Sequence, residues 1–599
     1  MRAVRPALAL TLSMGALCLA PTAHAGAAVE LEVLSSHSHG AFDEAAAEIT
    51  AHDRTTQQVA VVNAEAGTLD VLALDGAGQL APAGTFSPVG LEAADGSVIG
   101  EGAEVNSVDI SSDGLVALAV EAPDKVSPGW VVLGHLTTGG FAAESTVRVG
   151  SQPDMVRISP TGTHVLTADE GEPADDFSVD PAGTVSIIGL SAGAEGVEQE
   201  DVRTAGFASV ADSLDPAVRV FGPDVPAPSG TPSRVERNLE PEYVAVDPTG
   251  TTALVTLQEA NALAVVDIAS ARVTDVRPMS AKNWEQFALD SSKEDEQART
   301  FGGLPIEAML QPDAIEPFTS GAETFYVTAN EGDVREWGDY TEETTIGEVE
   351  LSAFPDLDAA WFQSEEVAGD LKISAEHGKD PETGTHSALH SFGGRSFSVV
   401  DASGRTVFES GGLLEELVAG LIADGTLPEH AWNANHDENP SLDSRSDDKG
   451  VEPEAATVGE VDGTPYLFLG LERISGIMVF DLTDPRDPQF VTWADNRGWE
   501  VEYDGEAAAG QGDLGPEGLE FVPADASPTG APLLVVGNEV SGTTTVWSVT
   551  GSGGPIIDTG RDADRSMGAG LLVGTLGLGL VAAGGVALGA ARRQAVSRG

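Results

Sequence analysis

The sequence predicts an all-β fold, a seven-bladed β-propeller with long loops on one face. Three observations predict it: a unit that recurs seven times between residues 29 and 549, a pattern of three or four short strands in each unit, and an N-terminal strand that belongs to no unit. Eight blades is the alternative count.

The recurring unit begins with a proline-containing turn that carries an acidic residue. An apolar-alternating strand follows, then a turn such as Pro-Thr-Gly-Thr, then a nearly continuous apolar strand that ends in glutamate. These two patterns are typical of successive strands of one sheet. Five copies are clear and two are looser; in chain order they are 48–65, 106–121, 152–170, 240–259, 311–331, 452–472 and 515–539.

Third and fourth strands complete the units. Third strands are expected at 262–268, 476–482 and 543–549, and a weaker fourth strand at 272–277. Four antiparallel strands in each repeat are typical of YVTN- and WD40-like propellers. Because the seventh copy ends at Val549 after its third strand, the stretch Val29–Leu34 is expected to supply the missing strand and cover an open sheet edge.

The N-terminus has the features of a secretory signal peptide, residues 1–25. Arg2 and Arg5 precede a mostly apolar stretch, and Ala23-His24-Ala25 offers small residues for cleavage. The single cysteine, Cys18, lies within this segment, so the mature protein is expected to contain no disulfide.

The C-terminus predicts a membrane anchor. Residues 567–591 contain no charge and are followed at once by Arg592 and Arg593. This segment is long enough for a transmembrane helix, with 592–599 as a cytoplasmic tail and the propeller, 26–550, on the extracellular face of the cell membrane. Residues 551–566 form the linker. Cell-wall attachment is the alternative, because 556–560 vaguely resemble a sortase signal.

The charge balance excludes one class of partner. The chain has 96 acidic and 30 basic residues, a net charge of −66. Such a surface repels nucleic acid and attracts cations. Acidity that serves only solubility, for instance in high salt, is the alternative.

Acidic residues recur at two positions of the unit, and both are expected at one mouth of the central channel. The loop that enters the first strand and the loop that leaves the second lie on the same face of a blade. Thirteen of these fourteen positions are carboxylates. The entering positions are Glu48, Asn106, Asp154, Glu242, Asp313, Glu454 and Glu517, and the leaving positions are Glu65, Glu121, Glu170, Glu259, Glu331, Glu472 and Glu539.

These two rings predict a divalent cation, Ca²⁺ by ligand preference, because like charges around a channel repel unless they are neutralised. The candidate ligands are Asp154, Glu170, Glu242, Glu259, Asp313, Glu331, Glu454, Glu472, Glu517 and Glu539. Capping of the turns by the entering acids is the alternative for the first ring. The long insertions 191–239, 280–310, 341–387 and 411–450 are expected on the same face, where function concentrates.

The insertion before the sixth unit contains candidate catalytic residues. His436, Asp437 and Asp443 are candidate acid–base groups or metal ligands, while Arg445 and Lys449, together with Arg473 at the end of the sixth unit, could hold an anion. A polar loop crosslinked by its own hydrogen bonds and ion pairs is an equal alternative. The stretch Gly393–Ser398 is more easily a strand start than a nucleophile site.

Several stretches resemble the choice-of-anchor I family, namely residues 42–53, 328–333, 392–398, 435–436 and 444–450. Animal relatives of that family are mesenchyme-specific cell-surface glycoproteins, and alkaline-phosphatase-like labels recur among bacterial members. The resemblance covers nearly all of residues 29–549 and implies a surface propeller with a C-terminal anchor of variable type. Members often carry an Asp/Gly-rich run where this chain has 377–384, which weakens any metal site placed there.

Two functions remain open. The first is a metal-dependent phosphoesterase of the phytase or alkaline-phosphatase type, in which Ca²⁺ polarises the phosphate of a small phosphorylated substrate. The second is a non-catalytic binding or adhesion module that displays its loop face to an extracellular ligand. We expect a monomer in either case, and no nucleic-acid partner.

Overall fold

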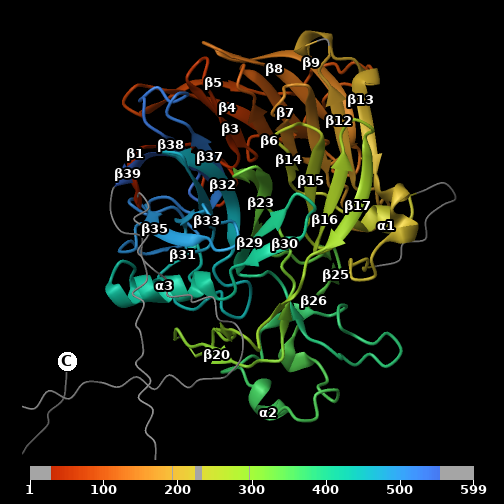
Figure 1. Cartoon of the computed structure of the whole chain (residues 1–599), viewed down its shortest axis with the longest axis vertical. Coiled ribbons are helices and arrows are strands. Elements are labelled where there is room, and N and C mark those ends of the chain that lie inside the picture. Colours follow the sequence, from red (N-terminus) through yellow and green to blue (C-terminus); the bar gives the residue numbers. More distant parts are fainter. Residues whose placement is uncertain (1–27, 192, 223–231, 296, 553–599) are drawn as a thin grey trace, which may run out of the picture. The chain divides into compact units, whose positions relative to one another are not determined.

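The computed structural model describes residues 28–552, apart from residues 192, 223–231 and 296 (Figure 1). The predicted signal peptide, the predicted membrane segment 567–591 and the predicted tail 592–599 lie outside the described residues.

Seven antiparallel four-stranded sheets follow one another along the chain, so the predicted blade count is confirmed. Each sheet uses consecutive strands except the fifth, which has an insertion between its second and third strands, and the seventh, which takes its outer strand from the N-terminus. The blades in chain order are β2 (Thr50–Asp53), β3 (Gln58–Asn63), β4 (Thr68–Leu74) and β5 (Leu80–Phe86); β6 (Glu104–Ile110), β7 (Leu115–Glu121), β8 (Pro128–Thr137) and β9 (Gly140–Ser151); β10 (Pro153–Ile158), β11 (His164–Asp169), β12 (Thr184–Gly189) and β13 (Val202–Gly206); β14 (Val244–Val246), β15 (Thr252–Leu257), β16 (Ala262–Asp267) and β17 (Arg272–Pro278); β22 (Ile315–Ser320), β23 (Glu323–Asn330), β29 (Ser396–Asp401) and β30 (Thr406–Glu409); β32 (Pro453–Val461), β33 (Thr464–Leu471), β34 (Gly476–Asp481) and β35 (Gln489–Asp495); β37 (Pro516–Val522), β38 (Leu533–Asn538), β39 (Thr543–Ser552) and β1 (Ala28–Ser38).

The first strands of the seven blades form a closed ring. Each contacts the first strand of the next blade, in the order β2, β6, β10, β14, β22, β32, β37 and back to β2. The N-terminal strand β1 pairs antiparallel with β39 from Ala28↔Ser552 to Ser38↔Thr543, as the sequence predicts. This pairing covers what would otherwise be an open edge of the last blade.

Apolar side chains fill the spaces between neighbouring blades. The second strands β3, β7 and β38 are buried along their whole length, which explains why they read as nearly continuous apolar runs. Between the third and fourth blades, for example, Ile187 and Val185 pack with Val255 and Ala264. The loops are therefore carried by blades that pack closely against one another.

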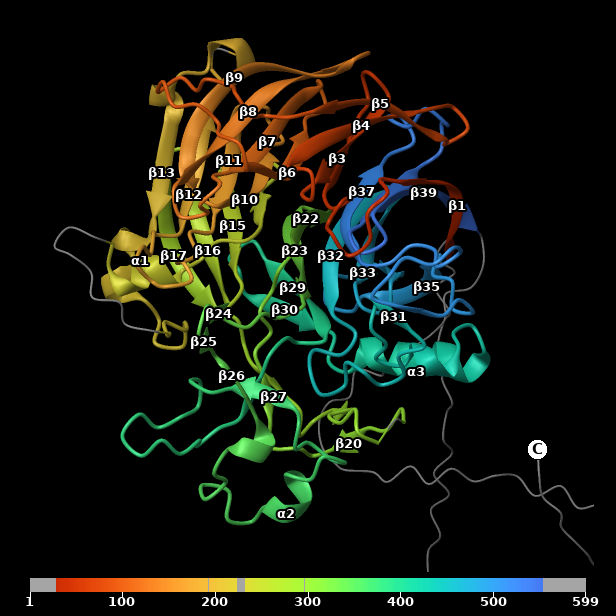
Figure 2. The ribbon, with the colours of Figure 1, turned by 180° about the vertical axis from the view of Figure 1, so that it is seen from behind.

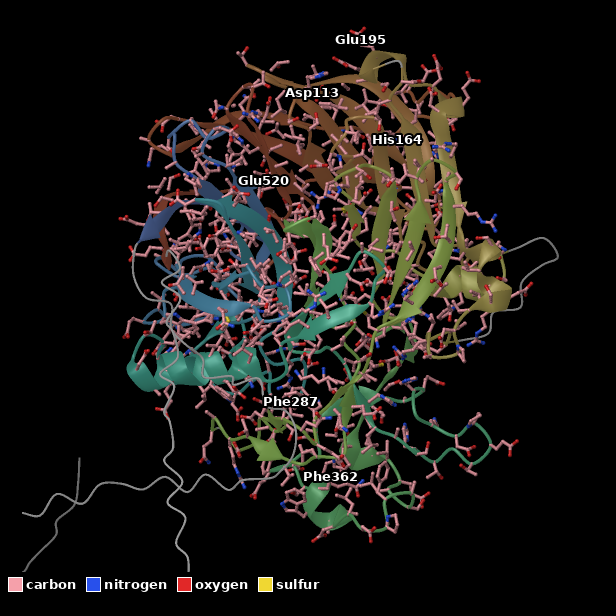
Figure 3. The ribbon with its side chains drawn as sticks, viewed as in Figure 1. Asp113, His164, Glu195, Phe287, Phe362 and Glu520 are labelled. Carbon is pink, nitrogen blue, oxygen red and sulfur yellow. The ribbon has the colours of Figure 1, made fainter. Side chains whose placement is uncertain are left out.

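Two insertions of the fifth-blade region build a small layer of their own (Figure 2). Its sheet has the order β18 (Lys282–Asn283), β21 (Glu307–Ala308), β28 (His390–Ser391), β27 (Lys372–Ser374) and β26 (Glu343–Thr345). Trp284 and Phe362 are buried in its core, and Phe287 packs at its border (Figure 3). The insertions also contain the hairpins β19 (Ala288–Leu289) with β20 (Phe301–Gly302) and β24 (Glu336–Trp337) with β25 (Tyr340–Thr341). The short strands β31 (Glu438–Asn439) and β36 (Tyr503–Asp504), which precede and follow the sixth blade in the chain, pair antiparallel with each other.

In the described part of the insertions there are three short α-helices: α1 (Arg234–Asn238), α2 (Ala359–Phe362) and α3 (Leu413–Asp424). Helix α3 buries Leu413, Leu414 and Val418 against the fifth and sixth blades. The insertion 191–239 does not lie on one face, because residues 190–201 connect the third strand of a blade, β12, to its fourth, β13. That part belongs to the face opposite the carboxylates, whereas 207–239 lead into β14 on the expected face.

The predicted fold class needs one correction. Within the described residues, no helix is long and apolar enough to cross a membrane, so the single transmembrane helix is not part of the observed fold.

Candidate functional site

One cavity at the mouth of the ring is lined by carboxylates. It has a volume of about 380 Å³, and all seven entering positions of the repeat line it. Glu121, Glu170 and Glu331 join them from the leaving positions, together with Glu104 and Asp333, which the repeat did not indicate. Glu65, the leaving residue of the first blade, is exposed and lies outside this lining. The repeat therefore located the first ring fully and the second ring in part.

Backbone irregularities at the start of the first strand mark three of the entering positions. The strand registers shift between Pro153 and Met155, between Pro453 and Ala456, and between Pro516 and Gly518. Asp154, Glu454 and Glu517 therefore occupy β-bulges, which re-aim a side chain relative to the pleat.

Burial and mutual repulsion hold the proton on many of these carboxyl groups. Burial, with repulsion from Asp154, raises the pKa of Glu48 to about 8. Burial, with repulsion from Glu121, raises the pKa of Asp154 to about 7. For the same two reasons, the pKa lies well above its usual range in Glu170, Glu242, Asp313, Glu454 and Glu517.

Four groups of side chains bring three potential ligand atoms within 4.8 Å of one another in the described part of the chain. Three of them consist of carboxylates and one includes a histidine. They are Glu170 with Glu242 and Glu259; Asp313 with Glu331 and Glu454; Glu331 with Glu452 and Glu472; and His436 with Glu472 and Glu539. Oxygen ligands in such groups suit hard cations such as Ca²⁺.

Basic side chains neutralise the side of the mouth that belongs to the fifth and sixth blades. Glu452, which is fully buried, lies 2.7 Å from Arg445, 3.0 Å from Arg473 and 3.4 Å from Lys449. Burial acts to raise the pKa of Glu452, but these three cations outweigh it and the pKa falls below its usual value. Glu452 precedes the proline of its unit, and sequence reasoning missed it.

His436 belongs to the same network. Its Nδ1 lies 3.1 Å from Glu472 Oε1, and its Nε2 lies 2.6 Å from a guanidinium nitrogen of Arg473. Burial opposes ionisation of Glu472, yet the charges of Arg473 and His436 lower its pKa. Asp437 stands apart from this network, with one buried carboxylate oxygen that has no hydrogen-bond partner in the described structure. Four of the predicted residues therefore form ion pairs with glutamates here, namely His436, Arg445, Lys449 and Arg473.

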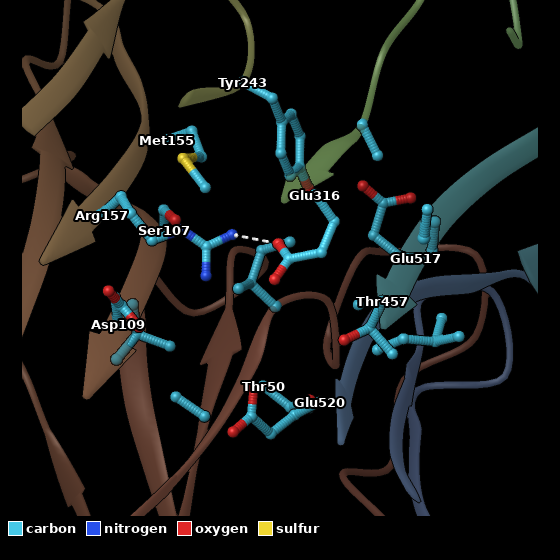
Figure 4. A pocket seen from close by; sticks show the side chains of 18 of the residues that line it. Thr50, Ser107, Asp109, Met155, Arg157, Tyr243, Glu316, Thr457, Glu517 and Glu520 are labelled. Carbon is cyan, nitrogen blue, oxygen red and sulfur yellow. Dashed lines mark hydrogen bonds and ion pairs between the residues drawn. The ribbon is translucent and has the colours of Figure 1, made fainter. Parts of the chain in front are cut away.

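A smaller cavity of about 80 Å³ lies deeper in the channel (Figure 4). Tyr243 lines both cavities and so marks the boundary between them. Below it, Arg157 extends toward Glu316 and lies 3.2 Å from its carboxylate. Burial raises the pKa of the neighbouring Glu520 to about 8. No sequence pattern indicated this pair, because its members come from different blades.

Comparison with protein families shows to which family this chain belongs. The model of the choice-of-anchor I domain matches residues 48–485. The chain belongs to the choice-of-anchor I family. The resemblance inferred from the sequence is therefore confirmed.

Two named proteins are similar in sequence to this chain. Gigasin-3a of Magallana gigas is 29% identical over 202 residues, which cover 33% of this chain and 69% of that protein. The mesenchyme-specific cell surface glycoprotein of Strongylocentrotus purpuratus is 30% identical over 283 residues, which cover 42% of this chain and 36% of the relative. The chain thus spans about a third of the length of the sea-urchin protein.

Solved structures resemble the chain only distantly. The hydrazine synthase of Kuenenia stuttgartiensis has a TM-score of 0.39 at 12% identity, covering 85% of this chain and 97% of its own. The WD40 domain of Toxoplasma gondii coronin has a TM-score of 0.40 at 9% identity, covering 90% and 89%. Likenesses at this level carry no argument about function.

Proposed function

We propose that this choice-of-anchor I protein is a non-catalytic binding module displayed outside the cell, and that it contacts its partner through the acidic mouth and the insertions around it. The observation that carries this proposal is the placement of the insertions. The segments 207–239, 280–310, 341–387 and 411–450 all connect strands at the carboxylate face. Family membership and the sea-urchin cell surface glycoprotein support display at a surface.

The chemistry of the mouth favours a positively charged partner. Its lining contains eleven carboxylate residues and one basic residue, Lys125. The ionised carboxylates give the mouth a negative field, and a cationic group that approaches the protonated ones favours release of their protons. We therefore propose a protein partner that presents lysine or arginine side chains to the mouth.

The phosphoesterase hypothesis has less support from the geometry. It needs basic groups that can hold a phosphate, yet Arg445 and Arg473 are bonded to Glu452, and Lys449 to Glu331. These ion pairs leave the proposed anion-binding groups already engaged. Hydrolysis of phosphomonoesters that depends on added Ca²⁺ and stops on chelation would restore this hypothesis.

A charge-reversal pair tests the binding proposal with a lysine-rich peptide as the probe. Glu104 is exposed at the acidic mouth, and Asp113 is exposed in a turn of the opposite face, between β6 and β7 (Figure 3). Glu104→Lys should weaken peptide binding clearly, whereas Asp113→Lys, with the same change in net charge, should leave it almost unchanged. Equal weakening by both variants would show that only the net charge attracts the peptide, and the proposed face would be abandoned.

A further inference from the structure

We propose that a single hard divalent cation of the calcium class binds between the third and fourth blades, held by the carboxylates of Glu170, Glu242 and Glu259. This inference goes beyond the proposed binding function and does not depend on it. The cation would be a resident part of the mouth, whatever partner the face contacts.

The repeat brings the three carboxylates together. Glu170 directly follows strand β11, Glu259 follows the equivalent strand β15 of the next blade, and Glu242 lies in the loop that enters β14. Their ligand oxygens lie within 4.8 Å of one another. Oxygens that share a calcium ion, each at 2.3–2.6 Å from it, lie at separations of this size, up to about 5 Å.

Glu259 shows that no cationic side chain is bonded to the carboxylates of this group in the described structure. The residue is only 3% exposed, and its Oε2 is buried without a hydrogen-bond donor in the described structure. The nearest cations have other partners: Arg335 donates to Glu240 and to the carbonyl of Asn238, and Arg219 pairs with Glu342. A buried carboxylate oxygen that accepts no hydrogen bond is costly. Glu259 is thus placed to bind a cation.

The other three groups differ in this respect. Two of them contain Glu331, which accepts a bond from Lys449, and two contain Glu472, which lies 3.2 Å from Arg473. In the group formed by Glu170, Glu242 and Glu259, the one side-chain bond in the described structure is that from the neutral amide of Gln152 to Glu170, at 2.5 Å. The chain therefore supplies its own cations on one side of the mouth and leaves the other side to an ion from solution.

Binding of Ca²⁺ to the full-length chain tests the proposal, after treatment with a chelator and with Ca²⁺ alone as the probe. Isothermal titration should show one strong site at neutral pH. Glu259→Gln should weaken this site by more than about tenfold, because it removes one of three charged ligands. The matched control is Glu65→Gln, which alters the same repeat position in the first blade, where the side chain is exposed; it should leave the site unchanged.

Thermal unfolding of the same variants separates loss of a ligand from loss of the fold. Without Ca²⁺, Glu259→Gln should unfold at a higher temperature than the wild type, because a neutral amide relieves the repulsion. With Ca²⁺, the order should reverse, because only the wild type gains stability from the ion. Glu242→Gln, at a partly exposed member of the group, should repeat this crossing.

Two results would overturn the proposal. One is the absence of a stoichiometric Ca²⁺ site in the wild type, with Glu259→Gln equally stabilising with and without the ion; protons would then neutralise the group. The other is a Ca²⁺ site whose affinity is the same in Glu259→Gln and in Glu65→Gln, which would place the ion elsewhere.

Discussion

The ammonium group of Lys449 lies 2.5 Å from Glu331 Oε1 and 2.7 Å from the carbonyl oxygen of Gly332. This contact joins the insertion before the sixth blade to the end of the second strand of the fifth. It also places a positive charge between two buried carboxylates, because Glu452 is 3.4 Å away on the other side. Lys449 thus occupies, on its side of the mouth, the role that we assign to a metal ion between the third and fourth blades.

Replacing Lys449 with methionine should destabilise the protein by about 3–5 kcal/mol, because it leaves Glu331 and Glu452 buried with less compensation. Added Ca²⁺ should recover part of this loss by entering the vacated position. The measurement is chemical unfolding with chelator and with Ca²⁺. Lys125→Met, which removes a lysine from the same cavity lining, is the control and should cost much less. A loss that Ca²⁺ does not reduce would contradict the equivalence of ammonium and ion.

Arg395 should be essential for the position of helix α3. Its guanidinium group is buried and bonds to Glu415 of the helix at 2.7 Å. It also donates to the carbonyls of Asp290, Ser446 and Asp448. The stretch Gly393–Ser398 therefore is a strand start, with β29 beginning at Ser396, and also a crosslink between two insertions.

Arg395→Lys should lower the free energy of unfolding by about 3–5 kcal/mol, because an ammonium group cannot reproduce the planar fork that serves four acceptors. Hydrogen exchange of helix α3 should become faster. Arg405→Lys, at an exposed turn of the same blade, should change neither quantity. Unchanged exchange in α3 would show that its apolar contacts alone fix the helix.

The scaffold could be predicted from the sequence because every blade repeats the same local chemistry. The proline turn before Asp154 and the apolar run after it recur in chain order, and Val29–Leu34 had one place left to pair. The entering positions of the mouth followed from this repeat, since symmetry places equivalent residues around one axis.

The contacts that set the charge of the mouth could not be predicted in this way. Glu452 meets Arg473, and Lys449 meets Glu331, across distances along the chain that no repeat encodes. The alternative interpretation of 435–450 as a crosslinked polar loop describes these pairs better than an anion site does. The repeat can also predict too much: Glu65 occupies the equivalent position in the first blade, yet its side chain is exposed to solvent.

Stability should depend on pH through the mouth carboxyl groups. Burial, with repulsion from neighbours, raises the pKa of Glu48 and of Glu539 from 4.5 to about 8. Between these values the folded state holds protons that the unfolded state has released, so stability falls as the pH rises toward 8. Each group should contribute a loss of about 1–2 kcal/mol between pH 6.5 and 8.

Two buried histidines act in the opposite direction at lower pH. Burial lowers the pKa of His377 to about 4 and of His390 to about 3, so the unfolded state binds more protons below pH 6.5. Between pH 4.5 and 6.5 the two histidines offset part of the loss caused by the carboxyl groups, so unfolding in urea with chelator should show stability that falls less steeply below pH 6.5 than above it. Glu48→Gln should reduce the fall across the whole range from pH 4.5 to 8, whereas His390→Gln should change the profile only below pH 6.5, where it makes the fall steeper. A His390→Gln profile that differs from the wild type above pH 6.5 would contradict these assignments.

Closure of the ring by β1 predicts that the N-terminal strand is required for a stable propeller. Val29 is 1% exposed and packs with Trp547 and Val549 in the core between the sixth and seventh blades. Deleting residues 1–38 should lower Tm and promote aggregation, because it uncovers the edge of β39 together with apolar surface. Deleting residues 1–27, which leaves β1 intact, is the control and should have little effect on Tm.

A point substitution separates the packing of β1 from its backbone pairing. Val29→Asp should destabilise by about 3 kcal/mol or more, because it buries an unpaired carboxylate, while Glu30→Gln, at the exposed neighbouring position, should remain within about 0.5 kcal/mol of the wild type. If the deletion of 1–38 unfolds like the wild type, the seventh blade is stable with three strands, and the ring does not depend on its N-terminal closure. If the deletion destabilises the protein but Val29→Asp does not, the hydrogen bonds between β1 and β39 close the ring, and the apolar side chains of β1 are not needed for it.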